Sequence, residues 1–266
     1  MWRGNYDLLF VFCFFLLNTS FASAIILSDG KGTGVLQFNT PYTLCVWNIY
    51  KQNKAGVESD LEKILGQNSI ILLQEYLLNK TLSPLLHAQV KKGFWWGAIE
   101  AFKVRNAFPT GVMTISNFEP FDFFGGHSSL VEPITNTPKS FIMSKFQISD
   151  SNMHLLVINN HILNFVSTEA FVTNIDQIGK LINEHPGPAI WAGDFNTWNS
   201  ARMNYLNQMA TKLGFTKVFI ENSGRRVPTD HIYIRRNIET LDAHFNTEIQ
   251  SSDHYPIFFR FRIQEL

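Results

Sequence analysis

Apolar residues along the chain follow two periodicities that alternate from about residue 42 to the C-terminus. Segments with apolar residues at every second position, or with a short continuous apolar run, predict β-strands. The predicted strands are 42–49, 70–73, 94–99, 111–115, 140–148, 154–159, 189–192, 231–234 and 256–261.

Helical periodicity separates some of these strands. Val57, Leu61, Ile64 and Leu65 share one face of a predicted helix, and a second helix begins near Ser167 or Thr168 and ends before Pro186. A third helix is expected over 201–213. Strands and helices mixed along the whole chain predict an α/β (α+β) sandwich.

One long insertion, residues 117–138, carries four Phe among Gly and Pro. We expect a loop whose rings pack on the core. A loop that faces the substrate or a lipid surface is the alternative.

Residues 1–24 have the layout of a secretory signal peptide, with Arg3, an apolar stretch over 8–17 and Ala22-Ser23-Ala24 before the cleavage point. We therefore expect export, to the periplasm or outside the cell. An uncleaved membrane anchor is the alternative, because apolar residues resume at 25–27. Residues 25–41 are rich in glycine and polar residues and suggest a leader or linker.

The bulk composition limits the function without defining it. The chain has 266 residues with 45% hydrophobic content, enough for one large domain, and its 22 Lys and Arg balance 22 Asp and Glu. Without a positive field, strong non-specific binding of nucleic acid is not expected, although catalysis on a phosphate needs only a local positive site. Cleavage would leave Cys45 alone, so we expect no internal disulfide and a buried, inert thiol.

Polar side chains stand at the ends of the predicted strands. They occupy six sites: Asn48, Glu75, His161, Asp194, Asp230, and Asp253 with His254. Any one of them alone would be read as a turn or helix cap. Together on one rim they would repel or stay unpaired unless a cation and hydrogen bonds satisfied them. Alternation also lets Asp194 and Asn196 point together, with Phe195 on the opposite side.

These residue types suit hydrolysis of a phosphoester. Oxygen ligands without cysteine favour Mg²⁺, with Mn²⁺ as the alternative, and no paired histidine spacing indicates zinc. An Asp beside a His can orient the imidazole as a base. Lys51 and Lys54 follow Asn48 and are candidates for substrate contact, whereas Arg235 and Arg236 are expected on a solvated face.

Six motifs, "WNIYK", "LLQE", "NNHILNF", "GDFNTW", "TDHIYI" and "SSDHYP", occur in this order between residues 44 and 261. This set resembles the endonuclease/exonuclease/phosphatase superfamily, which has the fold of deoxyribonuclease I. Within it, "PTGVMT" and Arg202 near "GDFNTW" are most similar to the bacterial YafD-like proteins. The resemblance implies a four-layer sandwich of two packed mixed β-sheets with helices outside, over residues 42–266.

The resemblance also implies a role for each metal and base residue. Glu75 would be the main metal ligand, supported by Asn48 and Asp253. His254 would activate the attacking water or stabilise the transition state, oriented by Asp230.

Three further roles follow from the same resemblance. Asp194 would hold the nucleophilic water or a second cation, and Asn196 would donate to a phosphoryl oxygen. His161 would be a second acid or a phosphate-stabilising cation. Its carboxylate partner has no motif, although Glu100 is available by position.

We therefore expect a metal-dependent phosphodiesterase, nuclease-like, acting without an obligate protein partner as a monomer. The alternatives are a phospholipid phosphodiesterase of the sphingomyelinase kind, a phosphomonoesterase, and a catalytically silent binding module. "LQEY" lacks the lysine of abasic-site endonucleases, and "TDHIYI" lacks the Trp and Arg of inositol polyphosphate phosphatases.

Overall fold

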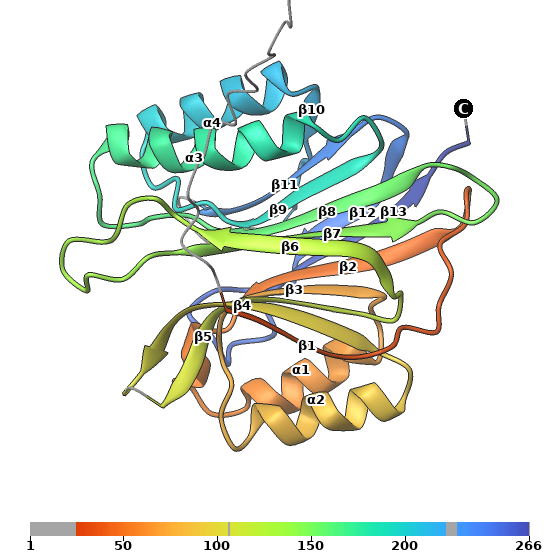
Figure 1. The fold of residues 1–266 in the computed structure, drawn as a ribbon, viewed down its shortest axis with the longest axis horizontal. Coiled ribbons are helices and arrows are strands. Elements are labelled where there is room, and N and C mark those ends of the chain that lie inside the picture. The colour runs from red at the N-terminus through yellow and green to blue at the C-terminus, as the bar shows by residue number, and fades with distance from the viewer. Residues whose placement is uncertain (1–24, 106, 222–227, 266) are drawn as a thin grey trace, which may run out of the picture.

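Two β-sheets face each other, and helices cover the outer face of each (Figure 1). The computed structural model describes residues 25–105, 107–221 and 228–265. The seven-stranded sheet has the order β1 (Ile26–Gly30), β4 (Trp95–Val104), β5 (Phe108–Ser116), β3 (Ile70–Leu77), β2 (Pro41–Asn48), β13 (Ile257–Ile263) and β12 (Ile238–Phe245). The six-stranded sheet has the order β10 (Phe215–Lys217), β11 (Asp230–Arg235), β9 (Ala189–Asp194), β8 (His154–His161), β7 (Ser140–Gln147) and β6 (Pro120–His127).

Four helices complete the sandwich among the described residues. α1 (Val57–Leu65) and α2 (Leu82–Lys91) pack on the seven-stranded sheet, and α3 (Thr168–Asn183) and α4 (Ser200–Lys212) pack on the six-stranded sheet. The four-layer fold predicted from the sequence is confirmed. None of the helices in these described ranges has the length and apolar character needed to cross a bilayer.

Burial on both faces explains why the central strands are apolar throughout. In β2, Leu44 and Val46 point into the core between the sheets, whereas Cys45 and Trp47 pack under the helices. Cys45 is fully buried, and burial raises the pKa of its thiol, so the expected inert cysteine is confirmed.

Parts of two segments, one expected to be a leader or linker and the other a loop, form strands instead. Within 25–41, β1 pairs with β4 as an edge strand, and Leu36 is buried in the core, so a linker is the wrong description of this segment. Within 117–138, β6 pairs with β7, and Phe123 packs edge-on against Trp95. Glycines weakened the strand signal in both segments, and pairing with a neighbouring strand overrode it.

Arg235 is a further correction. It is buried, where it donates hydrogen bonds to the carbonyl oxygens of Leu213 and His185 and lies over the Phe215 ring. Arg236 is exposed, as expected. The predicted signal peptide, residues 1–24, lies outside the described residues.

Candidate active site

Strand directions bring the predicted site residues to one end of the sandwich. β8 and β9 run parallel, with His161 beside Asp194 at their carboxyl ends. β11 runs antiparallel to β9, so its first residue, Asp230, lies opposite Asp194. β2 runs parallel to β3 and antiparallel to β13, which places Asn48 at the same rim as the turn before β13.

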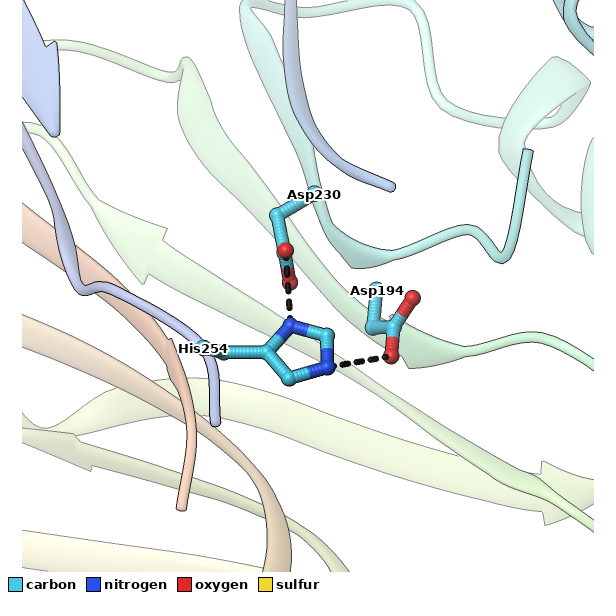
Figure 2. A group of neighbouring side chains, drawn as sticks. All are labelled: Asp194, Asp230 and His254. Atoms are coloured by element: carbon cyan, nitrogen blue, oxygen red, sulfur yellow. Dashed lines mark hydrogen bonds and ion pairs between the residues drawn. The ribbon is translucent and has the colours of Figure 1, made fainter. Parts of the chain in front are cut away.

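His254 lies between two carboxylates (Figure 2). Its Nδ1 is 2.8 Å from Oδ2 of Asp230, and its Nε2 is 3.8 Å from Oδ2 of Asp194. A carboxylate at Nδ1 fixes the tautomer of the imidazole and stabilises its protonated form. The turn that carries His254 is held in place by Trp47, whose Nε1 donates to the His254 carbonyl oxygen at 3.0 Å.

Asp194 is the centre of the arrangement. One of its oxygens, Oδ2, accepts a hydrogen bond from Asn48 Nδ2 at 3.1 Å and lies 3.6 Å from His161 Nε2. Burial, followed by the negative charge of Asp230, raises the pKa of Asp194 to about 6. A carboxylate that titrates so close to neutral pH is suited to proton transfer.

Glu75 reaches the rim because β3 is irregular at this position. The register with β5 shifts between Gln74 and Tyr76, and Glu75 has φ 52°, which turns its side chain out of the strand pairing. Its carboxylate forms an ion pair with Lys51 and lies 3.9 Å from His161 Nε2.

Lys139 is a site residue that the sequence did not indicate. Lys139 directly precedes β7. Its Nζ lies 3.9 Å from the Glu75 carboxylate and 3.4 Å from the buried carboxylate of Glu132. It follows a proline in the insertion, and no motif marks it. Two ammonium groups, those of Lys51 and Lys139, therefore flank Glu75.

Left-handed backbone is concentrated at this rim. Ten non-glycine residues in the described part of the chain have positive φ. Three of them, Lys51, Glu75 and Asn196, are site residues, and Tyr50 and Gln52 flank Lys51 in the turn after Asn48. Each such residue costs on the order of 1–2 kcal/mol, and such cost is typical of functional sites. Gly193 is also required, because it has φ 140° and an added Cβ would lie 2.1 Å from the Asn160 carbonyl oxygen.

Asn196 joins two loops. Its backbone N–H donates to Asp194 Oδ1 at 3.0 Å, and its side-chain amide donates to the Ile162 carbonyl oxygen at 2.8 Å. The backbone of Asn196 therefore lies beside Asp194, and its side-chain amide has a partner in the loop after β8. The strand ends at Asp194 and Asn196 has φ 50°, so this contact does not come from strand alternation.

His161 is neutral in this environment. Burial, followed by the positive charges of Lys139 and Lys51, lowers its pKa well below the usual value. Among the described residues, the carboxylates within 4 Å of His161 are Glu75 and Asp194, so Glu100 is not its partner. The fixed positive charge at this side of the site comes from the lysines.

Asp253 and Lys54 are both exposed and both contact Ser252 in the turn before His254. Asp253 accepts a hydrogen bond from the Ser252 hydroxyl at 3.4 Å. Lys54 is exposed, and its Nζ donates to the Ser252 carbonyl oxygen at 2.7 Å, which fixes the turn before His254.

The donor set fits a hard divalent cation. Glu75 and Asp194 supply carboxylate oxygens, and Asn48 adds an amide oxygen that also accepts a hydrogen bond from the Tyr50 backbone N–H at 3.0 Å. No thiol takes part in the site as described. Asp194, Asp230 and His254 also bring ligand atoms within 4.8 Å of one another. Burial, followed by the negative charge of Asp230, raises the pKa of Asp194, and a bound cation would stabilise the charged carboxylate against both.

Arg202 holds together the two loops that carry part of the site. It is 0% exposed, and its guanidinium donates to four carbonyl oxygens of the two loops that follow β8 and β9: Leu163 (3.2 Å), Asn164 (2.8 Å), Val166 (2.6 Å) and Asn196 (3.0 Å). The same group lies between the rings of Phe171 and Trp198. Arg202 is therefore a positioning residue for Asn196 and, through it, for Asp194.

We expect Arg202→Met to destabilise the fold by about 3 kcal/mol or more, because charged hydrogen bonds are lost and buried carbonyls stay unsatisfied. The specific activity of the folded fraction should also fall. Arg235→Met is the matched control, since Arg235 is buried on two carbonyls far from the rim. Urea unfolding and turnover of both variants test this, and an equal loss of turnover in the two would contradict a positioning role.

His231 makes a pH-dependent contribution to stability. It is buried against Thr197, and burial lowers its pKa to about 3. The unfolded chain, with a histidine pKa near 6.5, binds the proton more readily, so stability is lost as pH falls below about 6.5.

The wild type should lose about 2 kcal/mol more than His231→Gln between pH 7 and pH 5. Glutamine can still bond Thr197 but does not titrate. Urea denaturation at the two pH values measures this difference, and identical losses would show that His231 is not held neutral.

The sequence of the chain is similar to those of known proteins. A family model described as the Endonuclease/Exonuclease/phosphatase family matches residues 45–254. A UPF0294 protein of Vibrio parahaemolyticus is 30% identical over 242 residues, covering 88% of this chain and 83% of the relative.

Two solved structures share the fold. D. rerio TDP2 complexed with a single-strand DNA product has TM-score 0.61 at 15% identity, covering 84% of this chain and 100% of that one. The Bacteroides thetaiotaomicron mannosyl-6-phosphatase Bt3783 has TM-score 0.61 at 13% identity, covering 83% and 99%. At these identities the likeness concerns the fold alone.

Proposed function

The chain belongs to the endonuclease/exonuclease/phosphatase family, with relatives among the UPF0294 (YafD-like) proteins, and we propose that it is a phosphodiesterase dependent on a divalent cation. One observation carries the proposal. The imidazole of His254 is oriented by Asp230 and faces Asp194, beside a rim carboxylate, Glu75, that is flanked by two lysines.

Glu75, Asn48 and Asp194 would hold the cation, which we propose is Mg²⁺, with Mn²⁺ able to replace it. When bound, the cation supplies positive charge to the phosphoryl oxygens as the transition state forms.

The residues of the chain itself provide the proton transfer. Asp194 positions a water molecule, and His254 takes its proton as the water oxygen bonds to phosphorus. The bond from phosphorus to the leaving oxygen breaks, and that oxygen recovers a proton from solvent. Asp230 stabilises the imidazolium, while Lys51 and Lys139 stabilise charge on the phosphoryl group.

A substrate and metal panel tests the proposal. We expect the purified protein to hydrolyse an activated phosphodiester faster than the matching phosphomonoester, to stop with chelator and to recover with Mg²⁺ or Mn²⁺. Plasmid DNA, RNA and sphingomyelin are assayed beside these reagents. Hydrolysis indifferent to chelator, or confined to the monoester, would reject the assignment.

We also propose that the protein is exported and acts as a monomer. Support for export comes from the signal-peptide layout of residues 1–24. The sequence motifs favour a nuclease-like substrate, and the side chains on the surface around the site favour one class of phosphodiester over another.

A further inference from the structure

Exposed apolar side chains gather on three loops beside the candidate active site. Ile134 is 81% exposed, Phe165 61% and Trp198 50%, and Leu130 and Val131 are also exposed. We call these five residues the apolar rim. Large exposed apolar groups that lie together mark a site of interaction.

Hydrogen bonds join the three loops into one surface. The backbone N–H of Asn164 donates to Glu132 Oε1 at 2.9 Å, which connects the loop of Ile134 to that of Phe165. Arg202 bonds the carbonyls of Asn164 and Val166 and lies 4.6 Å from the Trp198 ring. The apolar rim is therefore held together by Glu132 and Arg202, which are both buried.

The same loops lead directly into the site. Phe165 follows His161 by four positions, and Trp198 follows Asn196 by two. Glu132, in the first loop, lies 3.4 Å from Lys139, which reaches Glu75. A surface that covers the apolar rim would thus present its phosphates to the two lysines.

The composition of the rim favours lipid over nucleic acid. Sites for single-stranded nucleic acid combine basic grooves with rings that stack on bases, whereas Leu130, Val131 and Ile134 are aliphatic and cannot stack. The chain has no net charge to attract a polyanion. Aliphatic and aromatic side chains that surround a phosphate site suit the interface of a bilayer.

We propose that the apolar rim inserts into the surface of a phospholipid bilayer and that the substrate is a phosphodiester in a lipid head group. The choice of substrate rests on the proposed phosphodiesterase function, whereas insertion does not. The structure also changes which part of residues 117–138 faces the lipid. Phe123 is packed on Trp95, and the exposed apolar tip is formed by Leu130, Val131 and Ile134.

The test uses two labelled forms of the full chain. Ile134→Cys places a polarity-sensitive dye on the rim, and Phe121→Cys places it on an exposed ring, 71% accessible, that stacks on His154 outside the rim loops. Both forms carry Cys13→Ser, and Cys45 is buried. Any attachment through the N-terminus is common to both forms, so the difference between the two positions reports the rim alone.

The dye is quenched by vesicles of phosphatidylcholine and phosphatidylglycerol whose acyl chains carry bromine. We expect quenching at position 134 to be at least about threefold stronger than at position 121, because inserted residues lie ~5–10 Å deep. Ile134→Asp with Phe165→Asp should weaken vesicle partitioning by about tenfold or more. Equal quenching at both positions, or at neither, overturns the proposal. A dye at 134 that responds to a single-stranded oligonucleotide and ignores vesicles would assign the rim to nucleic acid instead.

Turnover separates this inference from the function on which it rests. His254→Ala should keep the vesicle response and lose lipid hydrolysis. If the wild type inserts but hydrolyses no substrate, only the proposed phosphodiesterase function is rejected. If it hydrolyses dispersed diesters but does not insert, only the proposed insertion of the apolar rim is rejected.

Discussion

His254→Ala lowers the rate of phosphodiester hydrolysis by at least about a hundredfold at neutral pH, the cost of losing a positioned general base. The imidazole is the group that Asp230 orients, with Nδ1 2.8 Å from Oδ2, and that faces Asp194 at 3.8 Å. The backbone of the turn should stay in place, because Trp47 bonds the main-chain carbonyl of residue 254 and not its side chain. Steady-state rates and circular dichroism of the purified variant provide the measurement.

His244→Ala is the matched control. His244 also has a carboxylate at Nδ1, with Asp242 Oδ2 at 2.7 Å, but the pair is exposed on β12. We expect its rate to equal that of the wild type. A similar fall in both variants, or none in His254→Ala, would contradict the assignment of the base.

Glu75→Gln removes a metal-binding carboxylate and should lower the rate by at least about a hundredfold. The affinity for Mn²⁺, measured by calorimetry, should fall by at least about tenfold, since even partners outside the ligand shell contribute that much. The variant also removes the negative charge of Glu75, which lies between the ammonium groups of Lys51 and Lys139. Lower thermal stability at low ionic strength is therefore expected.

Glu239→Gln is the corresponding control. Glu239 pairs with Arg262 on the seven-stranded sheet, so its removal breaks an exposed ion pair without touching the rim. Its rate and Mn²⁺ affinity should remain those of the wild type. Unchanged Mn²⁺ affinity in Glu75→Gln would place the cation elsewhere, with Asp194, Asp230 and His254 as the remaining candidate.

Much of the candidate site was predictable because its residues interrupt local patterns. Asn48, His161, Asp194 and Asp230 each stand at a strand end, and strand ends can be read from apolar periodicity. His254 and Asp230 meet as the motifs implied. The central strands and α1, α3 and α4 were also predictable, since burial of one or both faces determines their composition.

Other features follow from pairing partners that local sequence does not encode. Glycines within β1 and β6 weaken a strand signal that neighbouring strands restore. α2 has proline in its first turn, which is compatible with a helix but obscures its start. Lys139, Glu132 and Arg202 each make at least one contact with a residue about 30 or more positions away. The apolar rim exists only where three loops meet.

Apolar periodicity was sufficient to predict a sandwich of mixed strands and helices and to show which polar residues stand at strand ends, whereas the four layers were implied by the family resemblance. The tertiary structure alone decided which of those residues meet. Strand direction put Asp230 opposite Asp194, while the turn before β13 left Asp253 exposed and turned His254 inward. It also decided the charge of His161, since a pKa depends on burial and on neighbours such as Lys139 and Lys51 that come from distant segments.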